Sequence, residues 1–157
     1  MPMKQKVWLS IGLLAAVALL IAACGAGSSA PEETAATGAF TKNADGYADI
    51  SVEQLAGMLG GPAKGQAEGK DFTLVNVHIP YEGEIPQTDL FIPFDQIADY
   101  QDQLPDKDAP IVLYCRSGSM SASAARDLAA LGYTNVLEVD GGFNGWQAAG
   151  YELLDSQ

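Results

Sequence analysis

Apolar and polar positions follow two patterns along the chain: continuous apolar runs, which predict strands, and helical patterns between these runs, which predict helices. Continuous apolar runs rich in Val, Leu and Ile are typical of strands that are buried on both faces of a parallel sheet. The predicted strands are 47–50, 72–77, 90–92, 110–114 and 135–139.

Helical patterns lie between these strands, and their first residues carry start signals. Ser51 is followed three residues later by Gln54, which is the pattern of a capping box and predicts a helix to about residue 59. Ser121 is the predicted cap of an Ala-rich helix that continues to residue 131. The two other predicted helices are 94–103 and one that opens at 141–142. The alternation of strands and helices predicts one α/β domain with a mainly parallel sheet.

The first segment is typical of an export signal. Lys4 and Lys6 precede an unbroken apolar run, 7–23. Because a membrane-spanning helix needs about 20 apolar residues, the run by itself leaves a single-pass anchor open. Residues 21–24, Ile-Ala-Ala-Cys, resemble the bacterial lipobox, which implies that Cys24 is acylated and is the first residue of the mature protein. The alternative is a signal anchor in which Cys24 is only a small apolar residue.

The lipobox interpretation divides the chain into three parts. We expect a lipoprotein signal peptide at 1–23, a lipidated flexible tether at 24–45 and a folded domain at 46–157. The tether consists mainly of Gly, Ser, Ala, Thr, Pro and Glu, which cannot bury enough apolar surface to offset the entropy of ordering. The predicted location is extracytoplasmic, with the lipid anchor holding the protein to a bacterial cell membrane.

Composition excludes several classes of function. The chain has 157 residues, which is enough for one ordinary domain, and a net charge of -12. So acidic a protein repels nucleic-acid phosphates, and we expect no nucleic-acid partner. One His and two Cys cannot build a structural zinc site or a Cys-x-x-Cys redox pair. We therefore expect neither a metal nor a cofactor, and we expect a monomer.

Cys115 is the leading candidate for chemistry. It directly follows the strand 110–114 and precedes a loop and a predicted helix, the place where open α/β sheets carry their ligands. Loop N–H groups and a helix N-terminus stabilise an anion, so we expect them to lower the pKa of the thiol. Arg116 adds positive potential if its side chain turns inward. The alternative is that Cys115 is a small buried apolar residue at the end of a strand.

The second half of the chain resembles the catalytic half of single-domain rhodaneses. The similarity is carried by Tyr-Cys-Arg-Ser-Gly-Ser-Met-Ser at 114–121, by Leu-Gly-Tyr at 131–133 and by Gly-Gly at 141–142 with Trp146. Upstream, 74–78 and 83–86 stand where the family has an Asp-Val-Arg strand end and a Gly-His-Ile-Pro turn. The resemblance implies a rhodanese-like three-layer fold, with a mainly parallel central sheet and helices on both faces.

The resemblance also implies a sulfurtransferase. Cys115 would attack a small sulfane sulfur donor, hold the sulfur as a persulfide and pass it to a thiol or another nucleophilic acceptor supplied from outside the chain. Backbone N–H groups of the loop would bind the charged sulfur, an electrostatic role like that of an oxyanion hole. The substrate-binding residues implied are Arg116, Ser117, Gly118, Ser119, Met120 and Ser121.

Three positions depart from the family pattern. Met120 stands where a cation is common, and Asn76 and His78 replace an Asp and an Arg behind the site, which removes an ion pair. His78 is interpreted as a hydrogen-bonded structural residue, with a proton shuttle as the alternative. Without these charges, a neutral persulfide or polysulfide donor is at least as plausible as thiosulfate. A second hypothesis is a catalytically weak module that binds a partner protein or a small anion.

Overall fold

A five-stranded sheet forms the centre of the domain. The computed structural model describes residues 40–61 and 70–155. The strands are β1 (Ala48–Ile50), β2 (Thr73–Asn76), β3 (Leu90–Phe91), β4 (Ile111–Tyr114) and β5 (Val136–Val139). Every pairing between them is parallel, in the order β1-β5-β4-β2-β3. The predicted α/β class with a parallel sheet is confirmed.

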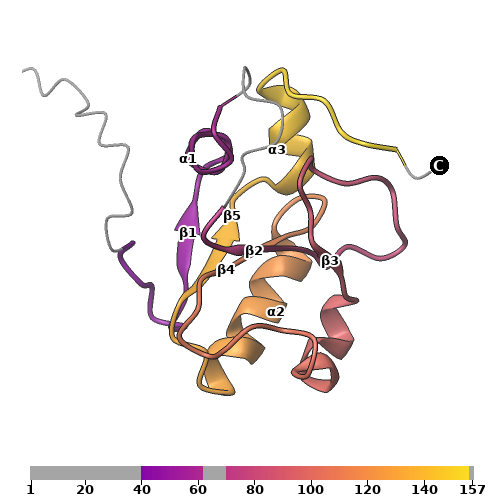
Figure 1. Cartoon of the computed structure of the whole chain (residues 1–157). Coiled ribbons are helices and arrows are strands. Elements are labelled where there is room, and N and C mark those ends of the chain that lie inside the picture. The colour runs from indigo at the N-terminus through magenta and orange to yellow at the C-terminus, as the bar shows by residue number, and fades with distance from the viewer. Residues whose placement is uncertain (1–39, 62–69, 156–157) are drawn as a thin grey trace, which may run out of the picture. The chain divides into compact units, whose positions relative to one another are not determined.

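Helices cover both faces of this sheet. They are α1 (Val52–Met58), the 3₁₀ helix η1 (Phe94–Tyr100), α2 (Ser119–Ala130) and α3 (Gly142–Ala148). Figure 1 shows α1 and α3 on one side of the sheet and α2 with η1 on the other. Such a three-layer arrangement places the carboxyl end of β4 beside the start of α2. Within the described residues, no helix is long and apolar enough to cross a membrane.

The start of α1 follows its sequence signal, whereas the start of α2 does not. Ser51 caps α1, because its Oγ accepts from the Gln54 N–H at 3.2 Å and its own N–H donates to Gln54 Oε1 at 2.8 Å. The predicted capping role of Ser121 is wrong. Helix α2 begins three residues earlier than predicted, at Ser119, with Gly118 as its N-cap at φ 100°, and Ser121 is buried in the first turn.

The 94–103 segment is shorter and tighter than predicted. It forms a 3₁₀ helix that ends at Tyr100 and is followed by turn residues. Its hydrogen bonds reach back three residues, as from the Gln96 N–H to the Pro93 carbonyl at 3.0 Å. Poorer hydrogen-bond geometry keeps such runs short, which is the physical reason why the helical pattern overestimates the length of this element.

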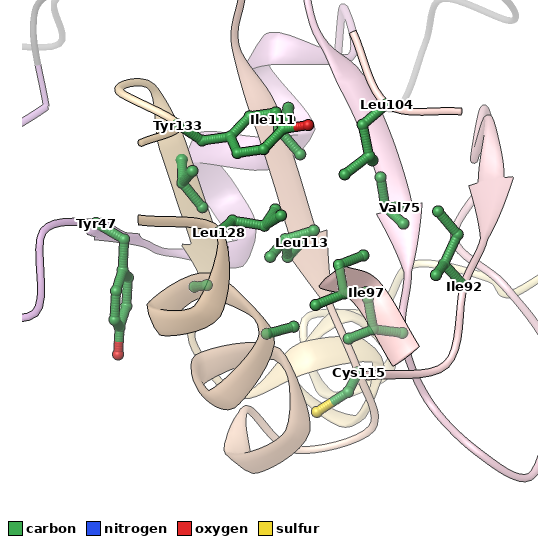
Figure 2. Close-up of a cluster of buried hydrophobic side chains, with 14 residues drawn as sticks. Tyr47, Val75, Ile92, Ile97, Leu104, Ile111, Leu113, Cys115, Leu128 and Tyr133 are labelled. Atoms are coloured by element: carbon green, nitrogen blue, oxygen red, sulfur yellow. The ribbon is translucent and has the colours of Figure 1, made fainter. Parts of the chain in front are cut away.

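Two apolar clusters fill the layers on either side of the sheet. The cluster under α2 and η1 includes Val75, Leu113, Cys115 and Val136, and Figure 2 shows the sulfur of Cys115 at one end of it. Side chains alternate between faces along a strand, so Glu138 lies on the same face as Val136. A carboxyl group therefore ends the apolar row of β5, next to the end of β4.

The predicted export signal 1–23 and the acylated Cys24 lie outside the described residues, as does most of the predicted tether. The last six residues of that tether are described. Phe40 packs against the apolar cluster on the α1 side, and Asp45 forms an ion pair with Arg126 at 3.3 Å. The described part of the tether is thus in contact with the domain.

Candidate active site

The Cys115 sulfur lies where an apolar layer meets a polar loop. Only 1% of the residue is exposed, and the side chain belongs to the cluster under α2. Its Sγ nevertheless has polar partners: the Gly118 N–H donates to it at 3.2 Å, and Ser121 Oγ lies 3.4 Å away. The thiol is therefore buried, but it is not sealed in apolar packing alone. A reagent must be small to reach it.

Two glycines allow the loop after β4 to close around this sulfur. Gly118 has φ 100°, which side-chain-bearing residues rarely adopt, and its N–H is the one that reaches Sγ. A Cβ on Gly142 would lie 2.1 Å from the Cys115 carbonyl oxygen. Because that space is open, the first N–H groups of α3 bind the carbonyls of the loop: Phe143 N–H donates to Cys115 at 2.9 Å and Asn144 N–H to Arg116 at 3.0 Å.

The other residues of the loop point in different directions. Arg116, Ser117 and Ser119 are exposed, whereas Met120 is partly buried against the cluster under α2. Since a helix leaves its first N–H groups without an intrahelical acceptor, those of Ser119, Met120 and Ser121 are available at the start of α2. Among the residues that the structure describes, no side chain caps this helix end.

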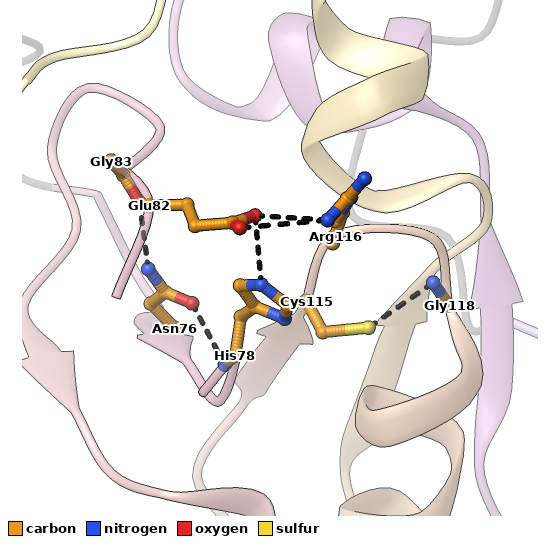
Figure 3. Close-up of polar contacts among 7 residues, drawn as sticks. All are labelled: Asn76, His78, Glu82, Gly83, Cys115, Arg116 and Gly118. Atoms are coloured by element: carbon orange, nitrogen blue, oxygen red, sulfur yellow. Dashed lines mark hydrogen bonds and ion pairs between the residues drawn. The ribbon is translucent and has the colours of Figure 1, made fainter. Parts of the chain in front are cut away.

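Glu82 forms a bridge between two basic groups at the rim of the site. Its carboxylate lies 3.1 Å from His78 Nε2 and 3.3 Å from Arg116 Nη1. Figure 3 shows Glu82 between these two side chains, with the Cys115 sulfur directed toward Gly118 instead. The positive charge of Arg116 is thus already paired with a carboxylate.

Asn76 and His78 support the loop that carries Glu82. The Asn76 amide donates to the Gly83 carbonyl at 3.0 Å, and its oxygen accepts from the His78 N–H at 3.0 Å. The His78 ring packs edge-on against Phe143, with 5.3 Å between the ring centroids. In the described residues no hydrogen bond joins His78 to Cys115, and His78 Nδ1 is buried without a partner. His78 thus contacts Asn76, Glu82 and Phe143.

Glu138 is the site residue that sequence reasoning missed. Its Oε1 accepts from Ser121 Oγ at 2.5 Å, and the residue is 4% exposed. Burial raises its pKa to about 7, against the lowering effect of the Ser121 hydrogen bond. Asp49 and Asp140 raise the pKa further by charge repulsion. The one available signal was an acidic residue inside an otherwise apolar strand.

An open groove of about 710 Å³ begins at this rim. It runs from Glu82 and Arg116 along α3 to the C-terminal segment, where Glu152 and Asp155 line it. Arg116 is the one basic residue in the lining, and it is paired. The groove at the rim therefore has a negative balance of charge.

Comparisons with known proteins agree with this geometry. The sequence pattern of the family described as Rhodanese-like domain matches residues 74–149. A sulfurtransferase of Allochromatium vinosum is 35% identical over 91 residues, which cover 56% of this chain and 83% of that protein.

The chain belongs to the rhodanese-like family.

Other rhodanese-like relatives and structures support the assignment. Thiosulfate sulfurtransferase GlpE of Tolumonas auensis is 29% identical over 102 residues, which cover 64% of this chain and 89% of that protein. The rhodanese-like domain protein of Staphylococcus aureus has a TM-score of 0.55 at 28% identity, with 69% of this chain and 97% of that chain covered. A rhodanese-related protein of Thermoplasma volcanium has a TM-score of 0.55 at 26% identity, covering 68% and 96%. The predicted rhodanese-like fold is confirmed.

Proposed function

We propose that this protein is a membrane-anchored extracytoplasmic sulfurtransferase that carries sulfane sulfur on Cys115. The observation that carries the proposal is the hydrogen bond from the Gly118 N–H to the Cys115 sulfur at 3.2 Å, at the uncapped start of α2. A donor to sulfur at a helix N-terminus stabilises a thiolate and a bound anion. The curated relatives named as sulfurtransferases support the same reaction class.

The reaction consists of two displacements on sulfur and needs no external oxidant. The Cys115 thiolate attacks the outer sulfur of a donor R–S–S⁻, the donor S–S bond breaks, and R–S⁻ leaves with the electron pair. Cys115 now carries a persulfide, Cys–S–S⁻. An acceptor thiolate then attacks its outer sulfur, which regenerates the Cys115 thiolate and yields the acceptor persulfide. We expect the N–H groups of Ser119, Met120 and Ser121, in the first turn of α2, to bind the charged outer sulfur.

The charges around the site favour a singly charged persulfide or polysulfide over thiosulfate as donor. Glu82 neutralises Arg116, and Met120 supplies no cation. The groove at the rim adds Glu152 and Asp155. A dianion such as thiosulfate is repelled by this arrangement more strongly than a monoanion or a neutral persulfide. The acceptor is a small thiol, because only 1% of Cys115 is exposed.

The proposed location depends on Cys24. Export and acylation at this residue would hold the domain at a membrane surface. In bacterial cells grown with a labelled fatty acid, we expect the label in the full chain and none in Cys24→Ala. An unlabelled full chain that is found in the membrane fraction contradicts the lipid anchor and favours a signal anchor.

Intact-mass spectrometry tests the sulfur chemistry. The domain without its signal is incubated with a polysulfide or with thiosulfate, and Cys115→Ser is treated in parallel. We expect a gain of one sulfur atom, roughly 32 Da, that is faster with polysulfide and absent from the variant. Because Cys115 is so little exposed, a binding module without catalysis is the second candidate. No adduct with either donor would select it.

A further inference from the structure

Cys115 is connected to a buried carboxyl group through one hydroxyl. Ser121 Oγ lies 3.4 Å from Cys115 Sγ and 2.5 Å from Glu138 Oε1. The three residues come from different elements, since Cys115 follows β4, Ser121 is in the first turn of α2 and Glu138 is on β5. We call them the carboxyl–hydroxyl–thiol chain. All three are nearly or fully inaccessible to solvent.

The carboxyl–hydroxyl–thiol chain has few protons to share among its hydrogen bonds. Ser121 has one hydroxyl proton and three acceptors nearby, the third being the Gly118 carbonyl at 3.0 Å. That carbonyl already accepts the Ala122 N–H at 2.9 Å. When Glu138 is ionised, its carboxylate accepts the hydrogen bond from the Ser121 hydroxyl, as expected from the shortest of the three distances. When Glu138 is protonated, it donates to Ser121 Oγ, and the Ser121 proton is free to donate to the sulfur.

We propose that Glu138 accepts the proton of the Cys115 thiol through Ser121 and, by the reverse transfers, returns it when the thiolate regenerated by sulfur transfer is protonated again. The S–H bond breaks and its proton goes to Ser121 Oγ, while the Ser121 proton goes to Glu138 Oε1. One negative charge is conserved and moves from the carboxylate to the sulfur. Glu138 touches no substrate and is thus a positioning residue for the nucleophile. This role of Glu138 rests on the proposed function only because that function makes the Cys115 thiol the attacking group.

The surroundings of Glu138 favour its protonated form. Asp49 is its register partner on β1, and Asp140 follows on the chain, so both neighbouring charges are negative. Arg126 of α2 pairs with Asp45 instead. In the described part of the chain, no Lys or Arg forms an ion pair with Glu138. A buried carboxylate without a cation is costly, and this cost falls when the negative charge moves to a sulfur that receives the Gly118 N–H.

The pH profile of Cys115 alkylation distinguishes this role from a purely structural one. Iodoacetamide, which is small and uncharged, is reacted with the protein from pH 5 to 10. We expect two steps in the wild-type rate, because coupled groups release their protons in two macroscopic steps. Glu138→Gln is expected to show one. The control is Asp49→Asn, which removes a carboxylate beside Glu138 that does not touch Ser121, and which is expected to keep both steps.

One step in both wild type and Glu138→Gln would overturn the proposal, even if the midpoints differ, since a difference in midpoint alone is a simple charge effect. A second measurement does not require a Glu138 variant to fold. The carboxyl ¹³C shift of Glu138 is titrated in wild type and in Cys115→Ser. We expect its titration to finish about one pH unit lower in Cys115→Ser, where no thiol supplies a proton to the carboxylate. Identical curves would overturn the proposal.

Neither readout depends on sulfur transfer. A protein that shows the coupled profile but gains no sulfur from any donor would contradict the proposed function and leave the carboxyl–hydroxyl–thiol chain intact. A protein that gains sulfur on Cys115 but shows a single-step profile would support the proposed function and overturn the carboxyl–hydroxyl–thiol chain.

Discussion

Gly142 is the position at which the loop around Cys115 is most sensitive to one added methyl group. A Cβ there would lie 2.1 Å from the Cys115 carbonyl oxygen and 2.8 Å from the Arg116 carbonyl carbon. Both contacts are with backbone, which cannot turn away as a side chain does. Gly142→Ala therefore forces the start of α3 away from the loop.

The expected cost can be summed from the contacts that are lost. Separation breaks the hydrogen bonds from Phe143 N–H and Asn144 N–H to the loop carbonyls, each worth about 1 kcal/mol. The φ of Gly142 is 54°, and a left-handed backbone costs a residue with a side chain about 1–2 kcal/mol. We expect Gly142→Ala to lower the free energy of unfolding by about 3–4 kcal/mol.

Urea unfolding followed by circular dichroism measures this change, and Gly57→Ala is the matched control. Gly57 lies within α1, and a Cβ there would meet nothing within 4 Å. Because Gly in a helix is less favourable than Ala, this control is expected to gain about 0.5–1 kcal/mol. If the free energy of unfolding of Gly142→Ala is within about 0.5 kcal/mol of the wild-type value, the close packing of α3 on the Cys115 loop is refuted.

Three further changes test the core, the buried carboxyl and the rim. Tyr114→Phe removes the hydroxyl that accepts from the Ile85 N–H at 3.0 Å; we expect a loss of about 2 kcal/mol in urea unfolding, and no loss would contradict the role of this bond. The pKa of Glu138 is about 7 in the folded protein, above its ordinary value of 4.5. The contribution of Glu138 to the free energy of unfolding is therefore full below pH 4.5 and is lost as pH rises through 7. Over this window the free energy of unfolding of wild type should fall by about 3 kcal/mol relative to that of Glu138→Gln. Parallel curves of stability against pH would contradict this prediction. Glu82→Gln frees the Arg116 charge, and we expect about threefold faster sulfur loading from thiosulfate, corresponding to a typical exposed ion pair, with loading from a singly charged organic persulfide, R–S–S⁻, as the control; equal acceleration with both donors would argue against the charge explanation.

Much of the fold could be predicted because local signals and tertiary packing agree. The capping box at Ser51 needs only four residues to specify a helix start, and the structure has both of its hydrogen bonds. The apolar run at 110–114 likewise forms the central strand β4 at Ile111–Tyr114, and all four residues of this strand are buried. From its end, the position of Cys115 at the sheet edge follows directly.

The details of the site depended on long-range contacts that a sequence pattern does not contain. Ser121 is a residue type that is favoured as a helix cap, but it lies in the first turn of α2, where its hydroxyl donates to Glu138, 17 residues away. Glu138 itself appeared as one acidic residue in an apolar strand. Only the parallel pairing of β4 with β5 brings it beside Cys115. The pairing of Arg116 with Glu82 spans 34 residues and was equally hidden.

Single-turnover sulfur transfer tests the central claim most directly. Protein loaded with polysulfide is freed of excess donor and mixed with glutathione, and the masses of both are followed with time. The account predicts that wild type loses roughly 32 Da while glutathione gains the same mass as a persulfide, and that Cys115→Ser neither carries nor transfers sulfur. Sulfur that stays on the protein, or that is carried equally well by Cys115→Ser, would contradict the account.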